Sequence, residues 1–151
     1  ANPVPEILPE QALAAGARVV ATGRSDFPNQ VNNSLAFPGI FRGALDVRAR
    51  TITDGMALAA AEELAAQAHR RGLRDDYIVP RMDEWQMFAD LAAATADHAV
   101  REGVAGVERT REDVRESARK IISHSREVNA LLFREGLLHA ETDNGKMEKS
   151  V

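Results

Sequence analysis

The chain has 151 residues, enough for one domain of ordinary size with its own core but too few for two. With 44% hydrophobic and 28% charged residues it is typical of soluble globular proteins, and its formal net charge of −4, spread along the chain, argues against a nucleic-acid partner. The absence of cysteine excludes disulfides and thiolate metal sites and fits a cytoplasmic location, and no apolar run approaches the roughly 20 residues that a membrane span needs.

The first elements in chain order are a loop and a short strand. Residues 1–10 hold three of the six prolines, at Pro3, Pro5 and Pro9, which predicts an extended loop. The opening is neither basic nor apolar, so we expect no secretory signal there. Residues 17–22 form an apolar run rich in β-branched side chains and end at Gly23, a pattern that predicts a buried parallel strand.

A polar loop and a helix follow this strand. Residues 23–30 combine glycine, serine, aspartate, proline and asparagine, as loops do. A helix is expected to begin near Asn32 or Asn33, since either side chain can accept a hydrogen bond from a free backbone N–H. Pro38 and Gly39 should kink or interrupt that helix.

Two further helices and a second strand are predicted in the middle of the chain. Thr53 can cap an alanine-rich helix over 55–71 that ends at Gly72. Residues 77–80, Tyr-Ile-Val-Pro, indicate a second short strand. A helix is then expected over 83–102, with Trp85 and Phe88 in the core.

The last predicted helix is long and amphipathic. Thr110 followed by Asp113 resembles a capping box, with aspartate in place of the usual glutamate, and the helix should reach about Arg134. Its apolar stripe consists of Val114, Ala118, Ile121, Ile122, Val128, Leu131 and Leu132. The final residues are polar and are expected to form a flexible tail.

The predicted fold class is α/β, the distal half of a Rossmann-like domain, helix-rich with about two short parallel strands. Parallel strands joined through helices need neighbours in a wider sheet, and two such strands cannot supply them. A part of the sheet upstream of this chain is therefore expected.

The candidate site is the loop after the first strand, since ligands of open α/β sheets bind beyond the carboxyl ends of the strands. Asn32 and Asn33 each offer a donor and an acceptor without charge, which suits a carboxylate, a ketone or a carboxamide, and helix N-terminal amides would add partial positive charge. The alternative, that both asparagines only cap the helix, has equal weight from spacing alone.

Other polar residues give weaker signals. The carboxylates of Asp26, Asp46 and Asp54 are scattered, so solvated surface or a helix cap is a better interpretation than a metal site. Arg24 and Arg42 flank the loop and can bind either an anionic ligand or a structural acidic partner. The four histidines lack metal-ligand spacing; they are His69, His98, His124 and His139.

Residues 21–47, which begin Ala-Thr-Gly-Arg-Ser-Asp-Phe-Pro-Asn-Gln-Val-Asn-Asn, resemble the malic enzyme family almost position for position. The opening Ala-Asn-Pro-Val-Pro-Glu, the alanine-rich helix and the Tyr-Ile-Val-Pro segment are similar to the family in the same order. The resemblance covers about two thirds of the chain. The chain departs from it at 81–87, where many members have a Pro-Phe-Asp-Pro-Arg type of segment, and the helix from Thr110 is extra relative to shorter members.

The resemblance implies that Asn2, Asn32 and Asn33 bind substrate, with Asn2 and Asn33 also contacting the cofactor. The family oxidises and decarboxylates L-malate to pyruvate with NAD or NADP and Mg or Mn. Its catalytic lysine and tyrosine and its metal ligands lie upstream of the matched part, and the chain has no Gly-x-Gly-x-x-Gly fingerprint. We therefore expect no catalytic residue and no metal ligand here, and an inactive chain in isolation.

The implied layout has three parts: residues 1–109 as the C-terminal part of the NAD(P)-binding domain, 110–139 as a C-terminal amphipathic helix of that domain, and 140–151 as a flexible tail. The expected partners are malate or pyruvate, the remainder of the malic enzyme as part of the same chain or as a separate subunit, and further copies in a homo-oligomer. The competing hypothesis is a non-catalytic helical binding or oligomerisation module that uses the helix from Thr110.

Overall fold

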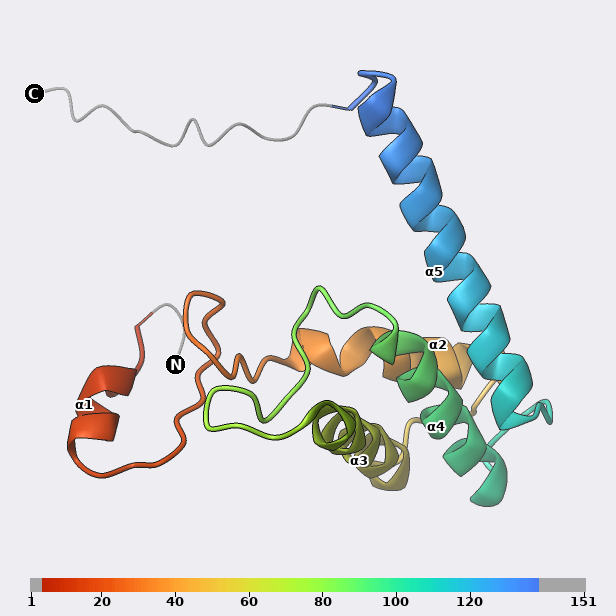
Figure 1. Ribbon diagram of the computed structural model, residues 1–151. Helices are drawn as coiled ribbons and strands as arrows, with labels where there is room; N and C mark the ends of the chain where they lie inside the picture. Colours follow the sequence, from red (N-terminus) through yellow and green to blue (C-terminus); the bar gives the residue numbers. More distant parts are fainter. Residues whose placement is uncertain (1–3, 139–151) are drawn as a thin grey trace, which may run out of the picture. The chain divides into compact units, whose positions relative to one another are not determined.

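The computed structural model describes residues 4–138, which form helices and connecting loops (Figure 1). The helices in chain order are α1 (Pro9–Ala14), the 3₁₀ helix η1 (Asn33–Leu35), α2 (Phe37–Asp46), α3 (Asp54–Arg71), α4 (Met87–Arg101) and α5 (Arg111–Arg134). The chain divides into two compact units, the first ending at Ala118 and the second beginning at Arg119. No helix among the described residues is long and apolar enough to cross a membrane.

Helix α4 is the centre of the first unit and packs against both α2 and α3 (Figure 1). Nine of its residues are buried, most of them alanines, and small side chains let neighbouring helices approach closely. On α2 the contact is made by Gly39 and Gly43. A Cβ on Gly43 would lie 2.4 Å from the carbonyl oxygen of Ala92, so the two backbones meet where a side chain has no room.

The helix ends follow the predicted capping residues. Thr53 accepts the N–H of Met56 through its hydroxyl at 3.1 Å, and α3 ends at Gly72 with a φ of 88°. At α5 the Thr110 hydroxyl accepts the N–H of Asp113 at 3.1 Å and donates to its carboxylate at 2.6 Å. Both predicted N-caps are therefore confirmed.

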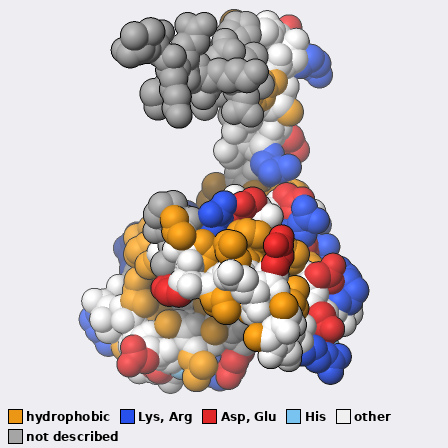
Figure 2. Space-filling model, turned by 90° about the vertical axis from the view of Figure 1, so that its left-hand side faces the viewer, with side chains coloured by type: hydrophobic (Ala, Val, Ile, Leu, Met, Phe, Trp, Pro, Cys, Tyr) orange, Lys and Arg blue, Asp and Glu red, His pale blue; other side chains and the backbone are white. Residues whose placement is uncertain are grey.

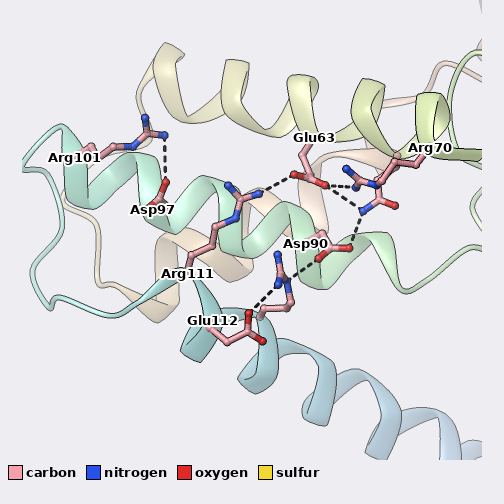
Figure 3. A network of polar contacts seen from close by, with 9 residues as sticks. Glu63, Arg70, Asp90, Asp97, Arg101, Arg111 and Glu112 are labelled. Atoms are coloured by element: carbon pink, nitrogen blue, oxygen red, sulfur yellow. Dashed lines mark hydrogen bonds and ion pairs between the residues drawn. The ribbon is translucent and has the colours of Figure 1, made fainter.

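Ion pairs join three helices of the first unit on its surface (Figure 3). Glu63 of α3 lies 2.7 Å from Arg70 of the same helix and 2.8 Å from Arg111 at the start of α5. Asp90 of α4 accepts a hydrogen bond from Gln67 of α3 at 2.7 Å. Because Val114 and Ala118 are fully buried in the same unit, the first turns of α5 are held by both apolar packing and charge.

The two predicted strands do not form among residues 4–138. Residues 17–22 make one isolated parallel bridge, Thr22 to Gln30, and the predicted strand at 77–80 is represented by one antiparallel bridge, Arg74 to Tyr77. A strand needs a neighbour that shares its backbone hydrogen bonds along several residues, and residues 4–138 supply only these single bridges. The helix-rich part of the prediction is confirmed, and the two-strand part is not.

Two helix boundaries differ from the predictions, and a third agrees with them. Pro9 begins α1 instead of belonging to an extended loop, since proline is well suited to the first turn of a helix. The interruption predicted near Pro38 is confirmed, since η1 ends at Leu35 and α2 follows as a separate helix with Pro38 in its first turn. Helix α4 begins at Met87, four residues later than predicted, because 83–86 are turn and loop.

Large hydrophobic side chains remain exposed on the first unit, and the face drawn in Figure 2 carries several hydrophobic side chains next to one another, with charged side chains around them. Phe37, Phe41 and Leu45 recur every four residues on α2 and are 46%, 49% and 68% exposed, with the two phenylalanine rings stacked at 5.4 Å. A monomeric surface seldom carries a stripe of this kind. These side chains are free to pack against a further polypeptide.

Candidate functional site

The loop that carries the candidate asparagines is closed at its neck by backbone hydrogen bonds. The N–H of Thr22 donates to the carbonyl of Asn29 at 3.3 Å, and the N–H of Val31 donates to the carbonyl of Thr22 at 2.8 Å. Beyond the neck, Leu35 of η1 is buried with Met87 and Leu91 of α4. The segment between these two attachments therefore has a defined path.

Asn32 and Asn33 have different surroundings although they are adjacent. The Oδ1 of Asn32 accepts the N–H of Ser34 at 3.0 Å, and its Nδ2 lies 3.5 Å from the carbonyl of Gly23. Asn33 is exposed, and its side chain makes no hydrogen bond to any residue between 4 and 138. Asn32 is thus the cap, whereas the carboxamide of Asn33 is available to a ligand.

Two further parts of the predicted site are Asn2 and the N-terminus of the helix that follows the loop. Asn2 lies outside the described residues, so its predicted role stays a prediction. The helix that begins at Asn33 has three residues, so it lacks the aligned peptide dipoles that would attract an anion to its N-terminus. A ligand at this place would depend on side-chain hydrogen bonds.

Asn29 is a functional candidate that the sequence reasoning passed over. Its side chain donates to the carbonyls of Val20 and Asp75 at 3.0 and 2.8 Å and accepts the N–H of Ile78 at 2.9 Å. The residue is 6% exposed and has a φ of 54°, in the left-handed region that asparagine tolerates better than most residues. The Pro-Asn pair in a polar loop was the available signal, but the partners 46 and 49 residues away were not visible in the sequence.

A cavity of about 550 Å³ lies between the two segments that Asn29 joins. Its lining comes from residues 25–30 and from 74–83, and it includes neither Asn32 nor Asn33. Pairs of arginine and aspartate two residues apart border it: Arg74 with Asp76 at 3.1 Å, and Arg81 with Asp83 at 3.6 Å. The charges at this rim are thus mutually compensated.

The two arginines that flank the loop are both in ion pairs. Arg24 lies 2.5 Å from Asp26 and stacks over the ring of Phe27, and this hydrogen bond holds the pKa of the Asp26 carboxyl below its usual value. Arg42 pairs with Asp46 one turn along α2. These contacts favour the structural interpretation of both arginines over the anion-binding one.

The acidic and histidine side chains do not converge. Among the described residues no group of three or more histidine, aspartate or glutamate side chains is placed to hold a metal ion. His98 lies 3.1 Å from Glu102 on α4, far along the chain from the loop, and His139 is outside the described residues.

The comparisons with known proteins all match members of the same family. Residues 12–100 match the family model described as malic enzyme, NAD binding domain. The bifunctional malic/malolactic enzyme of Bacillus subtilis is 52% identical over 121 residues, covering 80% of this chain and 30% of that protein. The NADP-dependent malic enzyme of Rhizobium meliloti is 48% identical over 120 residues, which are 70% of this chain and 16% of that protein.

The likeness extends to solved structures. The crystal structure of Entamoeba histolytica malic enzyme superposes with a TM-score of 0.88 at 52% identity and covers 89% of this chain. The chain corresponds to 28% of that structure. The chain thus spans less than a third of the length of these proteins.

Proposed function

The chain belongs to the malic enzyme family, and from this premise we propose that it is part of an oxidoreductase that oxidatively decarboxylates L-malate to pyruvate with NAD or NADP and a divalent metal ion. In this proposal residues 21–33 form the wall of the site that faces malate and the nicotinamide. The observation that carries it is the free carboxamide of Asn33, at the end of a loop whose path is fixed on both sides.

The chemistry of the asparagines fits binding and orientation. A carboxamide donates and accepts hydrogen bonds and does not titrate, so Asn33 can hold a malate oxygen or the nicotinamide amide without exchanging a proton with it. When bound, the nicotinamide supplies the hydride acceptor. The part played by this chain is to fix the distance and angle between the reacting carbon and that acceptor.

The metal has no matching residues in the described part of the chain. No cluster of acidic side chains is found there, and the carboxylates of Asp26 and Asp46 are already paired with arginines. No step that uses a metal is therefore assigned to these residues. The proposal places the metal ligands, the catalytic residues and the glycine fingerprint in the remainder of the polypeptide.

The exposed stripe of α2 supports this larger assembly. Gly39 and Gly43 face α4, whereas Phe37, Phe41 and Leu45 face outward. Covering these side chains would remove much apolar surface from water, which stabilises an interface by about 25 cal/mol per Å². In the proposal this stripe packs against the remainder of the malic enzyme chain, and Asn2 joins the site from the other side.

The Asn33 assignment is tested in the full-length protein. Replacing Asn33 by alanine removes one hydrogen bond to the ligand and leaves the helix cap and the core contacts intact. We therefore expect the KM for malate to rise about tenfold, the equivalent of about 1.4 kcal/mol. The melting temperature should stay the same. Steady-state kinetics and thermal melting of the two proteins provide the measurement.

Asn32→Ala is the matched control for this variant. Loss of the cap should destabilise the protein by about 1 kcal/mol. A KM unchanged in Asn33→Ala, measured with an active wild-type protein, would remove Asn33 from the site.

The second candidate function, an oligomerisation module, is favoured by the second unit. In α5 the side chains of Ile121, Val128 and Leu131 are 50%, 39% and 46% exposed. They continue the stripe that begins with the buried Val114 and Ala118. An amphipathic helix with an uncovered apolar face is suited to packing against another helix.

A further inference from the structure

Asn29 is buried although it is polar, and each of its side-chain hydrogen-bonding groups has a backbone partner. The two N–H groups of its carboxamide donate to Val20 and Asp75, and its oxygen accepts from Ile78. Burying an amide side chain costs little free energy when all its hydrogen bonds are made, but a buried amide without partners destabilises the fold. The side chain therefore ties the start of the candidate loop to the segment at 75–78.

The backbone of Asn29 belongs to the neck of the same loop. Its carbonyl accepts the N–H of Thr22, and its left-handed φ turns the chain toward Val31. Asn33 follows four residues later, just before the buried anchor Leu35. The position of the Asn33 carboxamide thus depends on two attachments, Asn29 on one side and Leu35 on the other.

We propose that Asn29 is a positioning residue for the ligand site: by clamping the neck of the loop to the 75–78 segment it sets the direction of the Asn33 carboxamide. This inference rests on the proposed function. Asn29 itself is buried, so it acts through the loop and does not touch malate. Its contacts connect loops only and belong to neither cluster of the helical core, so their loss should displace the loop while the helices stay packed.

The test uses Asn29→Gly in the full-length protein. Glycine adopts the left-handed backbone without strain, so this variant removes the three side-chain hydrogen bonds and little else. We expect the KM for malate to rise about tenfold or more with a smaller change in kcat, because a loosened loop binds malate poorly. Asn29→Asp should not rescue binding, since it turns an acceptor toward the carbonyls of Val20 and Asp75.

Two controls separate positioning from a loss of stability. Arg18→Ala removes an exposed ion pair between the residues that precede the loop and the 75–78 segment, to Asp75 at 3.1 Å, and should leave the KM unchanged. Met56→Ala empties a fully buried position in the helical core and should lower the melting temperature while the KM, measured well below that temperature, stays the same.

Each result decides between the hypotheses. If the wild-type protein reduces nicotinamide with malate and Asn29→Gly keeps a KM within twofold of it, the positioning role is wrong while the proposed function stands. If Met56→Ala raises the KM as much as Asn29→Gly does, Asn29 has only a structural role. If the wild-type protein has no malate-dependent activity, the proposed function is wrong, and the role of Asn29 toward malate is wrong with it.

Discussion

Three asparagines in one loop have three different roles because their neighbours differ. Asn29 is buried and clamps two segments, Asn32 caps η1, and Asn33 is exposed with a free carboxamide. An asparagine offers the same donor and acceptor groups at all three positions. Its role is therefore decided by which of these groups the protein already uses.

The carboxylate of Glu102, the residue that follows α4, gives a pH prediction at the scale of single residues. The Thr53 hydroxyl donates to Glu102 at 2.5 Å, and this contact, followed by one from His98, lowers the pKa of the Glu102 carboxyl below its usual value of 4.5. A lowered pKa means that the ionised form is favoured in the folded state. The stabilisation is complete above about pH 4.5 and is lost as the pH falls through the lowered pKa.

We expect the difference in melting temperature between the wild-type protein and Glu102→Gln to be constant from pH 7 to about 5.5. It should shrink as the pH falls below 4.5. Differential scanning calorimetry across this range measures it. A difference that stays the same down to pH 3 would show that the ionised carboxylate is not the stabilising form.

At the scale of the elements, the packing of α2 on α4 depends on glycine. The Cβ introduced by Gly43→Ala would lie 2.4 Å from a backbone oxygen and 2.9 Å from the Cβ of Thr95, so the helices must separate. We expect a loss of about 1–3 kcal/mol in the free energy of unfolding, larger than the gain of up to about 1 kcal/mol from the helix propensity of alanine. Urea denaturation measures the balance.

Gly55→Ala is the control for this substitution. Its Cβ would meet the ends of the Glu102 and His98 side chains, which can rotate away more cheaply than backbone can. The loss should therefore be smaller than for Gly43→Ala. Equal losses would mean that close backbone approach is not what limits the α2–α4 contact.

At the scale of the whole molecule, the isolated chain should be inactive. The described residues offer no metal-binding cluster, and no glycine fingerprint is present in the sequence. Mixing the chain with malate, NAD or NADP and Mn²⁺ should give no turnover in a spectrophotometric assay of nicotinamide reduction. Robust turnover would contradict the division of the site between this chain and the remainder of the polypeptide.

Sedimentation of the same sample tests the second candidate function. Self-association that Ile121→Asp abolishes would favour the oligomerisation module, because a charge at that position cannot be buried against another helix. If the chain is instead a monomer and binds the remainder of the polypeptide through the α2 stripe, the result would favour the hypothesis of an enzyme fragment. Phe41→Asp should prevent that addition.

The sequence by itself determined the longer helices, the caps of α3 and α5, and the family. Thr53, Gly72 and Thr110 act through neighbours a few residues away, so their roles are visible in a local pattern. The match over residues 21–47 pointed to malic enzymes in the same way, and the family is confirmed. Asn2 and the layout at 1–109, 110–139 and 140–151 stay predictions.

Only the tertiary structure decided which residues lack a partner and which have a distant one. Residues 17–22 have the composition of a strand, but a strand depends on a neighbouring segment that pairs along its length, and among the described residues only the single bridge from Thr22 to Gln30 forms. Asn29 depends on backbone groups 46 and 49 residues away, and Asn33 differs from Asn32 only in what surrounds it. Contacts between distant segments form when the chain folds, and a local pattern of residues does not encode them.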